Sequence, residues 1–143
     1  MIGAIEASIL ARLTDRLTGW RIAAMADVDL ARQQGGSAQP ALYLAFGGIE
    51  TLDAAGRGAA QRVDVAFVAV LVARHAQGAA RGASAARGAL ALFDDVFSAL
   101  AGFQPTGATG PLRLTGAGPA EYEPPTFWLP VEFSCSTVLK GAP

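Results

Sequence analysis

The segment QRVDVAFVAVLVAR, from Gln61 to Arg74, decides the fold because it is apolar on both faces of an extended chain. Positions of one parity carry Val63, Val65, Phe67, Ala69 and Leu71, and those of the other carry Ala66, Val68, Val70 and Val72. A strand of this kind needs cover on both sides of its sheet. We expect helices to pack on the Phe67 side and a neighbouring subunit to cover the other side.

Two amphipathic segments supply the helices. The first, from Ile2 to Leu17, repeats apolar residues at intervals of three and four, as a helix with one buried face requires. The second has Ser84 as a candidate N-cap, and Gly102 followed by Pro105 is placed to end it. Its core-facing side is predicted to carry Leu90, Phe93, Phe97 and Leu100, widened by Leu92, Val96 and Ala99.

Shorter alternating segments predict the other strands. They begin near Trp20, Ala41 and Leu112, and a longer one runs from Phe127 to Thr137. Pro130 cannot donate a ladder hydrogen bond, so we expect this last strand to lie at an edge or to carry a bulge. The long strand would reach roughly 45 Å if straight, at about 3.3 Å per residue, and is expected to bend or to project beyond the core.

These elements predict a single α+β domain over residues 1–143. Its sheet is expected to be mostly antiparallel, with four to five strands and both helices packed on one face, in the order α-β-β-β-α-β-β. A chain of 143 residues has the length of one domain. The segments Asp27–Gln39 and His75–Ala83 are expected to be loops.

Composition excludes several functional classes. A net charge of -1 gives no general attraction to nucleic acid, and no run reaches 18 apolar residues, so we expect a soluble protein without a membrane partner. The opening MIGAIEASILARL lacks a basic leader, which favours synthesis and retention in the cytoplasm.

Ten of the eleven cations are arginine, a bias that fits either interface contacts or a GC-rich genome. The single cysteine, Cys135, excludes an intramolecular disulfide framework and a multi-cysteine zinc site.

No catalytic constellation is recognisable. His75 is the only histidine and has no partner nearby in the sequence, and Cys135 falls on the inward parity of its strand. Asp94 and Asp95 diverge by about 100° on a helix, which is poor geometry for sharing a metal ion. We therefore predict that the protein is not an enzyme and holds no metal or cofactor.

The segment GAARGASAARG, Gly78 to Gly88, is glycine-rich and opens a helix. It lacks the lysine and hydroxyl of a phosphate-binding loop, so nucleotide or small-molecule binding is kept only as an alternative. Arg74, His75, Arg81 and Arg87 flank or occupy it and are predicted to form a basic patch that touches a phosphate backbone or an acidic partner surface. Trp128 lies on the outward parity of the last strand, where it fits either an interface anchor or a side chain covered by its own loops.

The order of these landmarks resembles a family of tail terminators from Mu-like phages and prophages, with a fold similar to that of the lambda tail terminator. The matching pieces cover more than half of the chain, and their specificity comes from order and spacing. They are IEASILARL (Ile5–Leu13), PALYLAFGG (Pro40–Gly48), QRVDVAFVAVLVAR, ALALFDDVFSALAGFQP (Ala89–Pro105) and FWLPVEFSCST (Phe127–Thr137). The chain departs from the family in a longer, more polar Asp27–Gln39 segment and in the Ala- and Gly-rich Gly78–Gly88 segment.

The resemblance implies a non-enzymatic morphogenesis protein at the head-proximal end of a virion tail, made in the cytoplasm of the bacterial host. It would form a ring, expected to be a hexamer, stop polymerisation of the tail tube and offer the head-joining surface. Its implied partners are copies of itself, the tail tube protein and a head-completion or connector protein, with no specific nucleic acid. A tail-derived cellular injection particle is another setting, and a head-tail connector or neck adaptor protein is the alternative function.

Ring formation needs two different complementary patches on each subunit. We predict Val68, Val70 and Val72 as one patch, so that Val70→Asp would block assembly and preserve the fold. The segments Arg74–Arg87 and the one after Asp27 are expected to gain order on docking. The predicted contact residues are Val68, Val70, Val72, Arg74, Arg81, Arg87 and Trp128.

Overall fold

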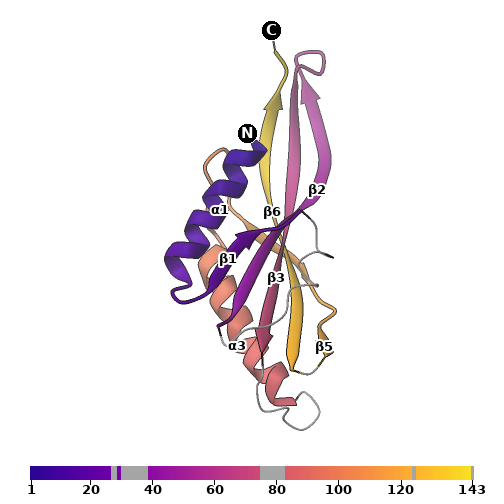
Figure 1. Ribbon diagram of the computed structural model, residues 1–143. Coiled ribbons are helices and arrows are strands. Elements are labelled where there is room, and N and C mark those ends of the chain that lie inside the picture. Colours follow the sequence, from indigo (N-terminus) through magenta and orange to yellow (C-terminus); the bar gives the residue numbers. More distant parts are fainter. Residues whose placement is uncertain (27–28, 30–38, 75–82, 124, 143) are drawn as a thin grey trace.

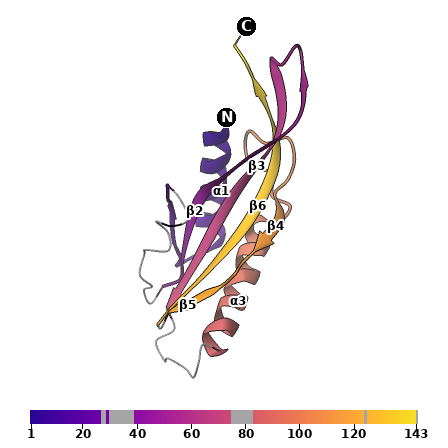
Figure 2. The same ribbon diagram turned by 90° about the vertical axis from the view of Figure 1, so that its right-hand side faces the viewer.

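Two helices lie on one face of a six-stranded sheet (Figures 1 and 2). The fold is described from a computed structural model for residues 1–26, 29, 39–74, 83–123 and 125–142, with the backbone alone at 83–87. The α+β prediction is confirmed. The elements are α1 (Ile2–Arg16), β1 (Arg21–Ala24), β2 (Ala41–Ala55), β3 (Ala60–Arg74), α3 (Ala83–Leu100), β4 (Arg113–Ala117), β5 (Glu121–Glu123) and β6 (Thr126–Lys140).

The sheet is mixed and larger than the sequence predicted. Its strand order is β1-β2-β3-β6-β4, and β5 pairs with a different part of β6. All neighbouring strands are antiparallel except β1 and β2, which are parallel. The sixth strand, β5, was not expected. Its three residues, Glu121–Glu123, are too few to display an alternating pattern.

The helix side of the sheet carries the main core. Ile5, Ile9 and Leu13 of α1 are fully buried there. From α3 come Ala89, Val96, Ala99 and Leu100, and the sheet presents Val63, Val65, Phe67, Leu71, Val131, Phe133 and Cys135. Burying a side chain of this size stabilises a fold by about 1.5–3 kcal/mol. The prediction that both helices cover the Phe67 side is confirmed.

The second helix, α3, ends where the sequence predicted but begins earlier. Gly102 follows α3 with φ +80, and the amide of Phe103 donates to the carbonyl of Leu100 at 3.1 Å, so the predicted stop is confirmed. The start differs, because α3 begins at Ala83 and Ser84 lies inside the helix rather than at its N-cap. The two helices are joined by Arg12, whose Nε donates to the carbonyl of Ala99 at 2.9 Å.

We call the opposite face of the sheet the open face. Two of its three central valines are buried by their own chain, which was not predicted. Val70 and Val72 are 0% and 1% exposed, and Val68 is half-buried. In register, Tyr43 lies beside Val70 and Trp128 beside Val72. Large aromatic side chains on both neighbouring strands thus shelter short valines between them. The expectation that Val70 and Val72 stay uncovered within one chain is wrong.

The strands β2, β3 and β6 extend past the helices as a long projection (Figure 1). β1 pairs only with Ala41–Leu44, so from Phe46 onward β3 is the one described strand beside β2. The hairpin reverses at Gly56, Arg57 and Gly58, all with positive φ. The long strand was expected to bend or to project beyond the core, and it projects.

Pro130 lies in an inner strand, and its pairing with β3 has no register shift, so the prediction of an edge position or a bulge is wrong. β6 has β3 on one side and β4 and β5 on the other. The carbonyl of Pro130 accepts from the amide of Gly118 at 2.8 Å, which directs its backbone polar groups to the β4 side. β4 ends at Ala117 and β5 begins at Glu121. The missing N–H therefore faces the gap between two short strands, where no ladder bond is lost.

Candidate assembly surfaces

The outer side of α3 carries an apolar stripe that the sequence had assigned to the core. Leu90 is 61% exposed and Phe97 is 42% exposed, whereas Val96 and Leu100 are buried. Asp94 is exposed and falls between Leu90 and Phe97, at positions i, i+4 and i+7 of one helix face. The prediction that Leu90 and Phe97 face the core is wrong. We call Leu90, Asp94 and Phe97 the α3 stripe.

The projecting hairpin exposes three large apolar side chains. Phe46, Ile49 and Leu52 are 47%, 42% and 43% exposed, and we call them the hairpin patch. Phe46 pairs with Phe67 in register, and their rings meet edge to face with centroids 6.1 Å apart. Ile49 pairs with Val65. Phe46 and Ile49 thus lie on the helix side of the hairpin, along the part of β2 that β1 does not pair with.

Polar residues cross the middle of the open face. Asp64 of β3 accepts from Ser136 Oγ at 2.6 Å and from Arg113 Nη2 at 2.5 Å. The Ser136 hydrogen bond, with help from Arg113, lowers the pKa of Asp64 against the opposing effect of partial burial. Thr115 donates to Glu132 Oε1 at 2.6 Å. These contacts tie β4 to β6 and β3, beside a groove of about 330 Å³.

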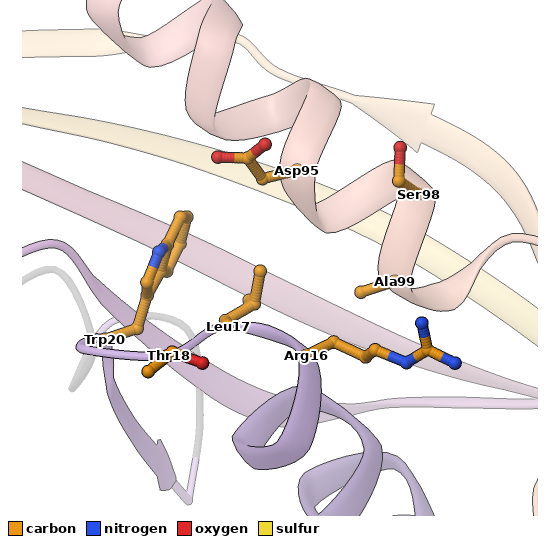
Figure 3. A pocket seen from close by; sticks show the side chains of 7 residues that line it. All are labelled: Arg16, Leu17, Thr18, Trp20, Asp95, Ser98 and Ala99. Atoms are coloured by element: carbon orange, nitrogen blue, oxygen red, sulfur yellow. The ribbon is translucent and has the colours of Figure 1, made fainter.

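A wider cleft lies between the end of α1 and α3 (Figure 3). It measures about 420 Å³ and has one charged residue on each wall, Arg16 and Asp95, with Leu17 and Trp20 beside Arg16. Its described lining includes no histidine or cysteine. No group of three or more His, Cys, Asp or Glu side chains in the described part of the chain is placed to hold a metal ion.

The predicted contact residues have different outcomes. Val68 is half-buried and lines a groove of about 260 Å³ on the open face, together with Pro130 and Glu132. Arg74 is exposed at the end of β3. Arg81 lies outside the described residues, as does the side chain of Arg87.

Trp128 was interpreted either as an interface anchor or as a side chain covered by its own chain, and it is partly covered and partly exposed. It is half-buried and packs against the cluster of Tyr43, Val70 and Val72. Its Nε1 is buried, and none of the described groups accepts its hydrogen. Val68, Val70, Val72 and Trp128 are therefore brought together on one face, and whether they contact another subunit stays a prediction.

The candidate reactive groups are placed as follows. Cys135 is fully buried, which raises the pKa of its thiol, so its assignment to the core is confirmed. Asp94 and Asp95 are exposed, as predicted. His75 and residues 78–82 lie outside the described residues, and residues 83–87 are described by their backbone alone. Within the described segments, no helix has the length and hydropathy that crossing a lipid bilayer requires.

Comparison with known proteins identifies the family. The family model for "Phage tail terminator protein" matches residues 6–143. Seventeen chains of solved structures also match. One of them aligns over 100% of this chain and 99% of its own length with a TM-score of 0.50 and 16% identity, which shows a shared fold. No curated protein matches. Since the family match spans nearly the whole chain, the protein belongs to the phage tail terminator family and is a structural protein of a phage tail.

Proposed function

We propose that this protein is a ring-forming tail terminator. Its copies assemble on the head-proximal end of the tail tube, stop further polymerisation and present the surface to which the head connector docks. The proposal extends the family's structural role in the virion tail to a specific place and action. A hexamer is the copy number proposed.

The observation that carries this proposal is the projecting hairpin with its exposed patch. Phe46, Ile49 and Leu52 lie in the part of β2 where β3 is the one neighbour among the described strands. The α3 stripe is a separate apolar surface on another element. Two different patches on one subunit fit head-to-tail contacts, which close into a ring when the rotation between subunits allows it.

The open face is the proposed docking surface for the tube or the connector. Val68, Arg74 and Trp128 retain exposed area there, beside the grooves along Thr115 and Glu132. Arg81 follows β3 in the sequence and is proposed to extend this surface with positive charge, whereas Arg87 belongs to α3 and is proposed as a separate contact residue. A mixed apolar and charged surface suits an interface that forms only once during assembly.

A tube-growth assay tests the proposal. Purified tail tube protein is polymerised with increasing amounts of this protein, and tube lengths and ends are recorded by electron microscopy. We expect shorter tubes with a density at one end, and a plateau in length once every growing end is occupied. Unchanged lengths with bare ends would reject termination. Binding to the connector without binding to tubes would instead support a neck adaptor.

A further inference from the structure

We propose that, in the ring, the tip of the projection of one subunit docks in an acidic groove on the open face of the next subunit. This inference rests on the proposed ring and names one contact that holds it together. The acidic groove is the groove of about 330 Å³ beside Asp64. The tip is the end of the projection, which carries Arg57 and Lys140.

The acidic groove runs across the strands of the open face. Its floor is one row of small residues that are neighbours in register: Gly48, Ala66 and Ser134. Glu50 and Asp64, which are also neighbours in register, bound it on the side of the tip, and Glu132 bounds it on the other side. Because Glu132 lies opposite Val68, the two walls are four residues apart along β3, or about 13 Å. This width suits the narrow end of a hairpin, whose strands are about 5 Å apart.

The groove is negative, and two of its carboxylates have no partner cation. Asp64 is paired with Arg113, whereas Glu50 and Glu132 form no ion pair with a described residue. Three carboxylates against one guanidinium leave the lining with a net charge of -2. In the described part of the chain these carboxylates are not gathered as the ligands of a metal ion. The groove therefore favours cationic side chains of a protein partner.

The tip supplies two cations of this kind. Lys140 lies beside Ala60 at the end of β6, next to the turn that holds Arg57 (Figure 1). Both cations are exposed, and neither forms an ion pair with a described residue. Between the tip and the groove, Arg62 and Asp53 are paired at 2.7 Å, so their charges cancel. Arg57 also holds φ +61, a conformation that glycine adopts at lower cost, which favours a use for its side chain.

Tip and groove do not meet within one chain. Ala60 and Asp64 are four residues apart on the same strand, about 13 Å, which exceeds the Debye length of about 8 Å at physiological ionic strength. A second copy brings a tip of charge +2 to a groove of charge -2. The two surfaces are different, so the contact is head-to-tail. Neighbours in a ring are rotated relative to each other, so projections inclined to the ring axis cross, as a groove across the strands requires.

Charge reversal of both surfaces tests the pairing. A groove variant carries Glu50→Lys and Glu132→Lys, and a tip variant carries Arg57→Glu and Lys140→Glu. Each variant alone opposes like charges at every contact, so we expect self-association to weaken at least ten-fold in a concentration series by light scattering, with an unchanged circular dichroism spectrum. Mixed in equal amounts, the two variants should restore the particle, because every groove then faces a tip of opposite charge in a ring where the variants alternate.

A matched control separates this contact from attraction by net charge. The control chain carries Arg16→Glu and Arg21→Glu, at exposed positions of α1 and β1, which give it the net charge of the tip variant and leave both surfaces native. It should assemble alone like the wild type and should leave the groove variant monomeric. If a reversed variant loses its folded spectrum, Glu50→Gln with Glu132→Gln removes the charge with little change of shape, and wild-type assembly of that variant would overturn the pairing.

The remaining outcomes separate the contact from the proposed function. Reversed variants that assemble like the wild type, or a mixture that stays monomeric while the wild type forms rings, would overturn the pairing and leave the proposed function standing. A restored particle of only two chains would show a reciprocal dimer and overturn the head-to-tail arrangement. Absence of any ring from the wild-type protein, free or on tubes, would instead reject the proposed function.

Discussion

Val70→Asp tests whether the side chain of Val70 is buried by its own chain or only by a neighbouring subunit. Val70 is fully buried on the open face beside Tyr43. Replacing a buried side chain of this size loses about 1.5–3 kcal/mol of burial. A polar group left there without a partner adds about 1–3 kcal/mol or more. The expected loss is about 3–6 kcal/mol, against a total of about 5–15 kcal/mol for a typical domain.

Val68→Asp is the matched control, because it makes the same chemical change two residues earlier on the same face. Val68 is half-buried and lies opposite Glu132 in register, so its new carboxylate reaches water. We expect a loss of about 1 kcal/mol, because the new carboxylate is solvated but faces the like charge of Glu132. Val70→Asp should therefore destabilise the folded chain itself, whereas the sequence alone predicted a preserved fold.

Urea denaturation followed by far-ultraviolet circular dichroism measures both variants at a protein concentration where the wild type is monomeric. The account predicts that the urea midpoint of Val70→Asp falls far below that of Val68→Asp. Equal midpoints close to that of the wild type would refute the reasoning. They would show that Val70 is accessible to water and would return the open-face valines to the subunit contact.

Three further predictions follow from local geometry. The hydrogen bond from Ser136 lowers the folded-state pKa of Asp64, so its stabilisation is present above the unfolded-state pKa and is lost as pH falls through the folded-state pKa. Asp64→Asn should thus cost about 1 kcal/mol at pH 7, and urea midpoints of variant and wild type should converge as pH falls below the ordinary range of carboxyl groups. Gly102→Ala should lower the free energy of unfolding by about 1 kcal/mol because Gly102 has φ +80, whereas Gly3→Ala in open space on α1 should raise it. Thermal denaturation should show the first change as a lower melting temperature and the second as a higher one. Leu90→Asp, which adds a charge to the exposed α3 stripe, should weaken self-association at least ten-fold in a concentration series by light scattering, and unchanged association would count against the α3 stripe as a subunit contact.

Sequence reasoning identified the elements whose signal is local. The apolar repeats of α1, the alternation in β3 and β6, and the stop at Gly102 each appear in a short window of residues, and each was found. The parallel pairing of β1 with β2 and the existence of β5 depend on what lies beside those strands. Pro130 shows the same limit, since its missing N–H is harmless only because β4 and β5 leave a gap next to it.

The candidate surfaces were harder to predict than the fold. The second helix has apolar residues around much of its circumference, so Leu90 and Phe97 fit a core face as well as Val96 and Leu100 do. Only the contact with the sheet decides which of them are buried. For the open-face valines, alternation gave the correct face but could not show that aromatic neighbours would shelter them.

The hairpin patch was missed for a different reason. Its residues lie in a segment of β2 with two bulges, where period-two alternation is broken. Phe46, Ile49 and Leu52 instead recur at intervals of three, which reads as a weak helical signal. A long strand beside a glycine-rich turn, with large apolar residues near that turn, is the signal that points to a projecting hairpin.

The mass of the assembled particle tests the central claim most directly. Light scattering behind a size-exclusion column, on the purified protein with and without tail tube protein, gives that mass independently of shape. The account predicts a discrete oligomer, for the proposed hexamer about 88 kDa, six times the chain mass of 14.6 kDa. A single species of 14.6 kDa at every concentration, which stays free when tubes are present, would contradict it.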